Sequence, residues 1–457
     1  MLGTVVAVVA GGALAMWLLG VWSHVPAKVS ESDKFRLDEI KLGLTVAAGL
    51  AAGVTLLVTL RRQVLHERTQ RFAEKDAVES RITALYVAAA DQLGSDKPAV
   101  RLAGLYSLER LGQDHPPLRQ TVVDVICAYL RMPYTPPIEF LPQNVEQSPS
   151  GPADDAAEPD EDKEAERRQE LQVRLTAQRL LAKHLRPRTD SAQSAVAADW
   201  FWRGPADEWM DIDLTGAALV KFDFSDCHLG HFAGEYAQFY ASTDLNKAQF
   251  HAHAEFDFAE FYSLVFMYGV QFHAHAGLHK ARFHSLTDLS RAQFRAGADL
   301  REAQFQSKIE LIGASFQAIA DLSETKFGAL ADLRKVQFHS DALFSMTEFH
   351  AKVDLGKAQF YGYAGLSHAQ FQAAVDLSGT RFHQLVDLTG AQFYGDAVVN
   401  GNQPVVGLKW DGALVARGDW LPIGWTVNGP SSDVNGLRRV TREEAPTDTQ
   451  YDSPDKG

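Results

Sequence analysis

The chain has 457 residues, of which 46% are hydrophobic and 22% are charged, which is enough for two or three folded units. Its 26 Phe and 8 Trp residues exclude disorder as the overall state, because such side chains must be buried somewhere. Two cysteines, Cys127 and Cys227, exclude a disulfide framework and a cysteine-rich zinc module, and the net charge of −14 argues against direct nucleic-acid binding.

Residues 1–60 contain two uncharged apolar runs. Residues 1–22 and 42–60 each carry no charged side chain, and at about 1.5 Å per residue each is long enough to cross a bilayer. A cleaved signal peptide is the alternative for the first run, but no Lys or Arg precedes it and a second run follows. We therefore expect a two-span transmembrane hairpin whose partner is the lipid bilayer.

The flanking basic residues predict the orientation of this hairpin. Residues 61–75 carry five Lys and Arg, and the loop between the runs carries four, which favours both termini in the cytoplasm. The expected location is the cell membrane, as a multi-pass protein with a cytoplasmic C-terminal part. Gly49 and Gly53 form a GxxxG motif, which leaves open either a homo-oligomer or packing against the first span.

Residues 61–140 read as a helical region. Apolar residues recur at helical spacing from Arg61 to about Leu93, and further helices are expected from about Lys97 to Leu111 and from about Leu118 to Leu130. Residues 141–170 hold ten acids and three bases with few large apolar side chains, which predicts an acidic, disordered linker. Residues 171–210 are expected to form a helix to about Leu185 and an N-terminal cap.

An 11-residue repeat dominates residues 211–400. From Leu245, steps of five and six residues alternate, and Phe stands at all fourteen positions from Phe250 to Phe393 at intervals of eleven. The partner positions are Leu in eleven cases, Phe in two and Met in one, and a small or short residue stands two before each Phe. Four such steps close a square coil of 22 residues, so Phe stacks on Phe and Leu on Leu at about 4.8 Å per coil. The fourteen units predict seven coils, and the earlier five-residue steps add about one and a half more.

The repeat resembles the pentapeptide-repeat family, whose A(D/N)Lxx pattern stands here as Ala298-Asp299-Leu300, Ala320-Asp321-Leu322 and Ala331-Asp332-Leu333. The resemblance implies a right-handed quadrilateral β-helix, and the extra residue in every second step is a variant seen in that family. Four further segments look like membrane-anchored pentapeptide-repeat proteins of actinobacteria: 91–102, 130–134, 174–179 and 211–217. The expected fold class is therefore a membrane-anchored α+β chain with two N-terminal transmembrane helices, a small helical region and the β-helix. The resemblance supplies no catalytic residue.

Aromatic residues flank the repeats. Six of the eight Trp residues lie before or after them, and we expect them to cover the open coil ends; residues 401–457 are expected to form a C-terminal cap and a disordered tail. Ligand stacking is the alternative role. The flanking tryptophans are Trp200, Trp202, Trp209, Trp410, Trp420 and Trp425.

Two rows of outward positions carry charge. The residue before the inward Leu is acidic in six of seven coils, and the residue two after it is Lys, Arg or Gly. A solvated face bonded between coils is the plainer interpretation of these stripes. The acidic row is Asp244, Phe266, Asp288, Glu310, Asp332, Asp354 and Asp376, and the other is Lys247, Gly269, Arg291, Gly313, Lys335, Lys357 and Gly379.

Four histidines lie one coil apart in two HxH triplets. His251 and His253 should stack over His273 and His275, which could bring four imidazoles within reach of zinc or nickel. The alternative is a solvated histidine ladder, since the rows continue through Arg295, Gln317 and Gly297, which do not ligate metals. We predict no metal site, no cofactor and no catalytic residue.

The predicted architecture supports two competing hypotheses about function. The first is a membrane-tethered, non-enzymatic module that offers the β-helix surface to an unidentified protein partner. The second is a DNA mimic acting on an enzyme such as gyrase, as some relatives in the family do. The repeats from 211 to 396 hold 22 acids and 14 bases in mixed rows, which disfavours mimicry. The sequence also contains no Ser/His/Asp motif, phosphate loop or HExxH, so an enzyme is not expected.

Overall fold

The computed structural model describes residues 31–142, 161–187, 201–204, 208–398, 408–409, 413–415, 425–427 and 438–442. The chain divides into two compact units, residues 1–82 and 83–457. The first predicted span, 1–22, lies outside the described residues.

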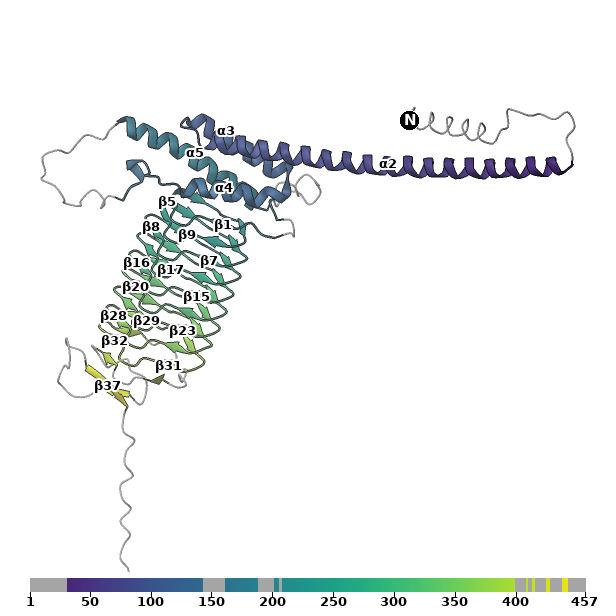
Figure 1. Cartoon of the computed structure of the whole chain (residues 1–457). Helices are drawn as coiled ribbons and strands as arrows, with labels where there is room; N and C mark the ends of the chain where they lie inside the picture. Colours follow the sequence, from purple (N-terminus) through teal and green to yellow (C-terminus); the bar gives the residue numbers. More distant parts are fainter. Residues whose placement is uncertain are drawn as a thin grey trace, which may run out of the picture. The chain divides into compact units, whose positions relative to one another are not determined.

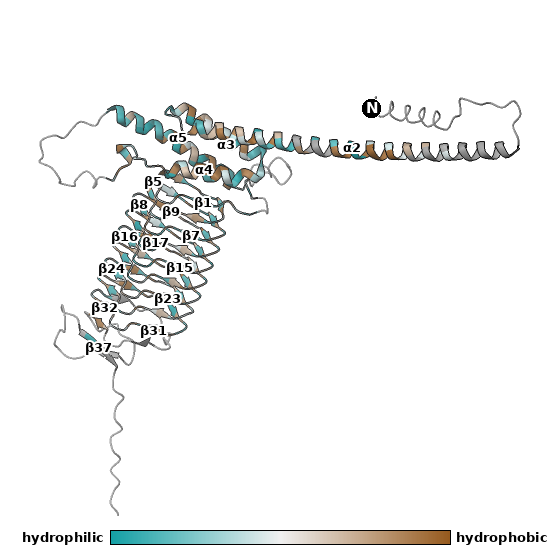
Figure 2. Ribbon diagram, in the orientation of Figure 1, coloured by the Kyte–Doolittle hydropathy of each residue, from teal (hydrophilic) through white to brown (hydrophobic). Residues whose placement is uncertain are grey.

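The described part of the first unit belongs to a long helix, α2 (Glu31–Leu93), which includes the uncharged run 42–60. Val54, Leu56, Leu57, Val58 and Leu60 on this helix are all exposed. Figure 2 shows a hydrophobic, brown stretch of α2. In the part of the chain that the structure describes, no helix meets the length and hydropathy needed to cross a membrane.

The second unit begins with the predicted helical region. The expected helices are confirmed as α3 (Pro98–Asp114) and α4 (Arg119–Arg131). A short 3₁₀ turn follows each helix: η1 (Pro116–Leu118) follows α3, and η2 (Ile138–Phe140) follows α4. The leucines spaced three residues apart form the buried face of α3, since Leu105, Leu108 and Leu111 are buried. The stripe of α2 is buried only at its end, at Ala89 and Leu93.

Helix α5 (Glu161–Leu185) begins ten residues before residue 171, the expected start, inside the predicted acidic linker. Three of its first four residues are acidic, and negative charge stabilises the N-terminal end of a helix. Glu164 also accepts a hydrogen bond from the backbone N–H of Ile138 at 3.2 Å, which holds this end of α5 against η2. The prediction of a linker up to residue 170 was based on composition, which does not reveal this local electrostatic preference.

The repeats form a right-handed β-solenoid of about 9 turns (Figure 1), as the counting predicts. Its strands are nearly all two residues long and pair in parallel with strands about 22 residues away, in four faces. The inward Phe rings stack from coil to coil: Phe283 lies on Phe305 at 4.7 Å between ring centroids. The predicted inward positions are confirmed, with Phe305 only 1% exposed.

The four faces follow one another around each coil. The first face is β3 (His228–Leu229), β6 (Gln249–Phe250), β10 (Gln271–Phe272), β14 (Gln293–Phe294), β18 (Ser315–Phe316), β22 (Gln337–Phe338), β26 (Gln359–Phe360) and β30 (Arg381–Phe382). The second is β1 (Ile212–Asp213), β4 (Phe232–Ala233), β7 (Ala254–Glu255), β11 (Ala276–Gly277), β15 (Ala298–Asp299), β19 (Ala320–Asp321), β23 (Ala342–Leu343), β27 (Ala364–Gly365), β31 (Val386–Asp387) and β34 (Leu408–Lys409).

The third and fourth faces join into one sheet because β2 (Ala218–Asp223) and β5 (Gln238–Asp244) run across the corner between them. The third face continues through β8 (Glu260–Phe261), β12 (Arg282–Phe283), β16 (Gln304–Phe305), β20 (Lys326–Phe327), β24 (Glu348–Phe349), β28 (Gln370–Phe371), β32 (Gln392–Phe393) and β35 (Leu414–Val415). The fourth continues through β9 (Val265–Phe266), β13 (Thr287–Asp288), β17 (Ile309–Glu310), β21 (Ala331–Asp332), β25 (Val353–Asp354), β29 (Val375–Asp376) and β33 (Ala397–Val398).

Both ends of the solenoid are covered. At the first coils, Leu171 of α5 packs with Ala218, Val220 and Tyr240 of the solenoid. Trp202 is buried and stacks on the His184 ring of α5, with ring centroids 4.2 Å apart. At the other end, β37 (Arg438–Arg442) pairs antiparallel with β35 and with β36 (Trp425–Val427). Trp200, Trp410 and Trp420 lie outside the described residues.

Candidate interaction surface

Every 11-residue unit turns its first corner in the same way. In the unit around Leu289, the backbone N–H of Ala292 donates to the Leu289 carbonyl at 3.0 Å, and Arg291 between them has a φ of 57°. A positive φ at the third residue of a four-residue turn defines a type II turn. The predicted row of Lys, Arg and Gly is therefore the row of left-handed turn residues, which point away from the core.

Carboxylates of the acidic row stabilise these turns. The Asp288 carboxylate accepts the backbone N–H of Ser290 at 2.8 Å, and Asp321, on the second face, accepts that of Ser323 at 3.0 Å. An Asp side chain that bonds its own backbone two residues on stabilises a turn. The repeated Ala-Asp-Leu pattern thus has a structural cause, and the acidic stripe is largely occupied with the fold.

Several of these carboxylates are also neutralised. Arg334 forms an ion pair with Asp332 at 2.7 Å, and Arg301 forms one with Asp299 at 2.6 Å. Burial alone would raise the pKa of Asp332, but its hydrogen bonds from Arg334 outweigh burial and the pKa lies below its ordinary value. Such rows present less free negative charge than their sequence indicates, which weakens the DNA-mimic hypothesis.

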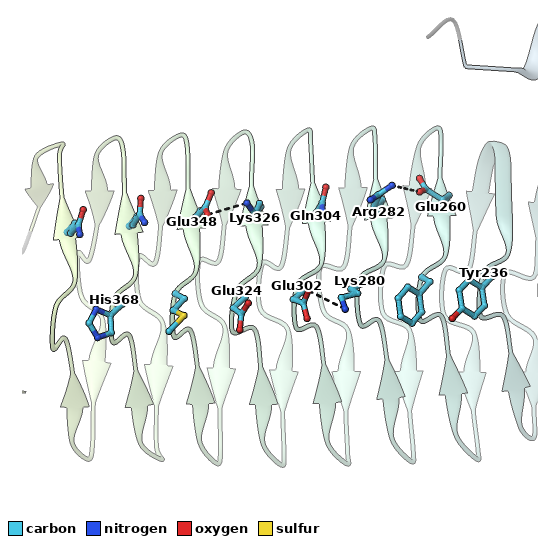
Figure 3. A pocket seen from close by; sticks show the side chains of 14 residues that line it. Tyr236, Glu260, Lys280, Arg282, Glu302, Gln304, Glu324, Lys326, Glu348 and His368 are labelled. Carbon is cyan, nitrogen blue, oxygen red and sulfur yellow. Dashed lines mark hydrogen bonds and ion pairs between the residues drawn. The ribbon is translucent and has the colours of Figure 1, made fainter. Parts of the chain in front are cut away.

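A groove of about 840 Å³ runs along the third face, between the turn row and the strand row (Figure 3). Between the two rows lie the small residues two before each Phe, such as Ala303 and Thr325, which are fully buried. Its two walls are Tyr236, Phe258, Lys280, Glu302, Glu324, Met346 and His368 on the turns, and Glu260, Arg282, Gln304, Lys326, Glu348, Gln370 and Gln392 on the strands.

The charges of this groove are mostly paired with one another. Lys280 pairs with Glu302 at 3.4 Å, Arg282 with Glu260 at 3.0 Å, and Lys326 with Glu348 at 3.2 Å, as the dashed lines of Figure 3 show. Glu324 is the groove carboxylate outside these pairs. The turn row begins with two aromatic residues, since Tyr236 stacks on Phe258 with ring centroids 4.8 Å apart, and Met346 near its other end is exposed.

The four histidines of the HxH triplets lie where the repeat places them, at the corner after the first face. The His251 and His273 rings stack face to face with centroids 4.6 Å apart, while His253 and His275 are tilted and 6.1 Å apart. Among the described residues, no group of three or more His, Cys, Asp or Glu is arranged to hold a metal ion. The ladder interpretation describes this geometry.

The ladder continues into the N-terminal cap through Trp209, a contact that the sequence does not reveal. Trp209 lies flat on His251 at 3.8 Å between centroids, and the Arg203 guanidinium lies 3.6 Å from the Trp209 ring centroid. Burial, together with His273, His228 and the nearby arginines, lowers the pKa of His251 to about 4. Burial also lowers the pKa of His228 and of His273. Burial therefore favours the neutral form of these imidazoles.

A buried ion network fixes the helices over the first coils. Arg174 of α5 pairs with Glu170 at 2.8 Å and donates to the carbonyls of Leu130 and Met132 at 2.9 and 2.8 Å. Arg101 of α3 reaches the other oxygen of Glu170 at 2.8 Å. Three of the four segments that resemble the anchored proteins thus meet at one network, whose geometry indicates a structural role.

The same helices contact the solenoid through polar bonds. Gln120 of α4 donates to the Asp211 carbonyl at 2.9 Å, and Arg131 forms an ion pair with Asp213.

Both cysteines are free and buried. Burial raises the pKa of the Cys127 thiol to about 12 and also raises the pKa of the Cys227 thiol, so neither is a reactive thiolate.

Comparison with known proteins identifies the repeat. The family model described as pentapeptide repeats (9 copies) matches residues 355–401. No curated protein and no solved structure matches the chain significantly. The matched residues are the last coils of the solenoid, and the parallel pairing from coil to coil extends back to β1, where the interval between paired residues shortens from 22 to 20.

Proposed function

Because this chain is a pentapeptide-repeat protein, we propose that it is a membrane-tethered, non-enzymatic scaffold whose solenoid surface binds a protein partner. The β-solenoid is a general protein-interaction fold. The observation that carries the proposal is the groove of the third face, which offers rows of side chains at fixed spacing. Eight coils contribute to it, over a length of roughly 34 Å at about 4.8 Å per coil.

The rigidity of this surface supports binding without chemistry. The core beneath it is a column of stacked rings, from Phe239 on Phe261 at 4.4 Å to Phe371 on Phe393 at 4.6 Å. A preorganised surface loses little conformational entropy when a partner binds. Open rows of paired charges suit the recognition of another protein, where complementary charges select the partner and its register.

The tether rests on residues 1–60. The run 42–60 has no charged side chain and is followed by Arg61 and Arg62, and its described apolar side chains from Val54 to Leu60 are exposed on α2. Exposed apolar surface of this kind needs a cover, and a bilayer is the cover that its length fits. We propose that both termini, and with them the solenoid, lie in the cytoplasm.

Membrane fractionation of cells that express the full chain tests the tether. We expect the chain to remain with membranes after washing with high salt or carbonate, and to be released when Val54, Leu56 and Leu57 are replaced by Asp. Recovery of the unaltered chain in the supernatant would contradict the tether and leave the scaffold proposal standing.

Crosslinking from isolated membranes tests the scaffold. We expect the full chain to capture a defined protein, and capture to fall when the groove is altered at Gln304 and Glu324 but not when exposed Arg110 of α3 is altered. A supercoiling assay with purified gyrase is the second arm: inhibition at stoichiometric amounts would favour DNA mimicry and overturn the scaffold.

A further inference from the structure

One face of the solenoid is basic, although the net charge of the chain is −14. The basic face comprises the first-face strands with their flanking turns: residues 247–253, 269–275, 291–297, 313–319, 335–341, 357–363 and 379–385. These segments hold six Lys and Arg residues and one acid, Asp341. The matching segments of the groove face, which start at 258 and repeat every 22 residues to 390–396, hold five Lys and Arg and five acids.

The cations of the basic face form no ion pair with a described carboxylate, although Arg291 lies over the Tyr268 ring, 5.5 Å from its centroid, and Arg295 donates to Gln271 at 3.4 Å. Lys247, Arg291, Lys335 and Lys357 occupy left-handed turn positions, with φ between 56° and 62°, and point into solvent. None of the four forms an ion pair with a carboxylate that the structure describes. Lys280 occupies the same turn position on the groove face and is neutralised by Glu302 at 3.4 Å. The excess positive charge is therefore available to a ligand.

Neutral hydrogen-bonding groups fill the rest of the face. A row of glutamines runs beside the cations in register, as Gln249 on Gln271 and Gln271 on Gln293 show. The next row holds stacked rings on either side of Arg295 and Gln317, with His251 on His273 at 4.6 Å, His339 on Tyr361 at 5.1 Å and Tyr361 on His383 at 4.6 Å. Because the rings cover one another's faces, the row offers ring edges and not open faces. Single-stranded nucleic acid, which binds by base stacking on open aromatic faces, is a poor fit.

The neighbouring faces limit the width of the ligand. The fourth face carries Asp288, Glu310 and Asp332, and the second carries Asp299 and Asp321; Arg334 neutralises Asp332 and Arg301 neutralises Asp299, so the rows on both sides of the basic face offer no excess positive charge. The extended part of one side of a coil, about three residues at about 3.3 Å each, is about 10 Å wide. A nucleic-acid duplex, whose major groove alone is about 12 Å wide, would overlie these neighbouring rows and gain no further attraction from them.

We propose that the basic face binds an extended acidic segment of a partner protein, laid along the coil axis. A single peptide strand fits the width of the face, and its carboxylates match the unpaired cations. Seven coils at about 4.8 Å accommodate about ten extended residues. This inference rests on the proposed scaffold function and names the chemistry of the partner.

Peptide binding to the detergent-solubilised full chain tests the inference. The probe is a fluorescein-labelled peptide of ten glutamates, measured by anisotropy at fixed salt. The test variant is K335E with K357E, and the matched control is K75E with K97E, two exposed lysines on and beside the helices α2 and α3, which makes the same change in net charge. Glu stands naturally at this turn position in Glu302 and Glu324, with φ of 56° and 60°, so the fold tolerates the substitution.

We expect the K335E/K357E variant to bind the peptide at least about tenfold more weakly, and the control to change by less than about twofold. Equal losses in both variants, or no loss in the first, would overturn the assignment to this face. A 20-base-pair duplex that binds more tightly than the peptide, and is lost in the same variant, would overturn the protein partner in favour of nucleic acid.

Crosslinking from membranes separates failure of this inference from failure of the scaffold. A partner that K335E/K357E still captures and the groove variants lose would refute the basic face and leave the scaffold intact. If the peptide binds but crosslinking recovers no defined protein, the scaffold fails and the acidic protein partner fails with it.

Discussion

Replacing Phe305 probes the stacked core directly. Phe305 is 1% exposed and lies between Phe283, 4.7 Å away, and Phe327, 5.4 Å away, with both ring pairs within 9° of parallel. Removing a buried Phe side chain costs about 3–5 kcal/mol, since burial is lost and a cavity remains. The rings above and below lose their partner together, so Phe305→Ala should fall at the upper end of this range. Phe305→Asp should cost more, because it adds an unpaired buried carboxylate.

Hydrogen exchange of the full chain measures this cost locally. The amides of β12, β16 and β20 bond from coil to coil through the replaced residue, so their exchange in Phe305→Ala should be faster by more than about a hundredfold. Gln306→Ala is the control: Gln306 is the next residue and exposed, and its replacement should change stability by less than about 0.5 kcal/mol. Equal effects of the two changes would refute the assignment of inward and outward positions.

Three further changes test the turns, the packing between coils and the histidine ladder. Asp321→Ala should cost about 1 kcal/mol through the lost bond to the Ser323 amide, and Asp321→Asn, which keeps an acceptor, should restore most of it in thermal unfolding; no rescue would assign the role to charge. Gly362→Ala should destabilise the chain strongly, because a Cβ there would lie 2.4 Å from the Ser340 carbonyl carbon. Gly313→Ala should cost only about 1 kcal/mol, because Gly313 has a φ of 67° but open space around it. A larger loss of stability for Gly313→Ala than for Gly362→Ala would contradict the packing between coils. The pKa of His251 is about 4 in the folded chain and about 6.5 in the unfolded chain, so the stability that neutral His251 contributes should be complete above pH 6.5 and be lost as the pH falls through 4. Trp209 fluorescence reports this titration, because the indole lies on the His251 ring. A titration midpoint near pH 6.5 would contradict the stack.

The solenoid could be predicted from the sequence because its contacts are periodic. Phe250 meets Phe272 through a fixed interval of 22 residues, so counting alone identifies which side chains touch. The charge rows could be counted as well. Their physical role could not, because it depends on backbone geometry: Arg291 has a positive φ, and the Asp288 carboxylate is directed at the backbone of its own turn.

The helical region was predictable only in outline. Spacing located α3 and α4, but the Arg174–Glu170–Arg101 network joins residues up to 73 positions apart that no periodicity relates. The stack of Trp209 on His251 likewise joins the cap to the first HxH triplet through space alone. The start of α5 at Glu161 was missed because acidic composition indicates a linker, whereas acidic residues in a first turn stabilise a helix.

Site-specific photocrosslinking in cells tests the central claim, that the solenoid surface binds a protein, most directly. A photoreactive residue in place of Gln304 on the groove face or Gln293 on the basic face should yield a discrete adduct with another protein. The same residue in place of exposed Tyr106 on α3 should yield none. Adducts from Tyr106 alone, or no adduct from either face of the solenoid, would contradict the account.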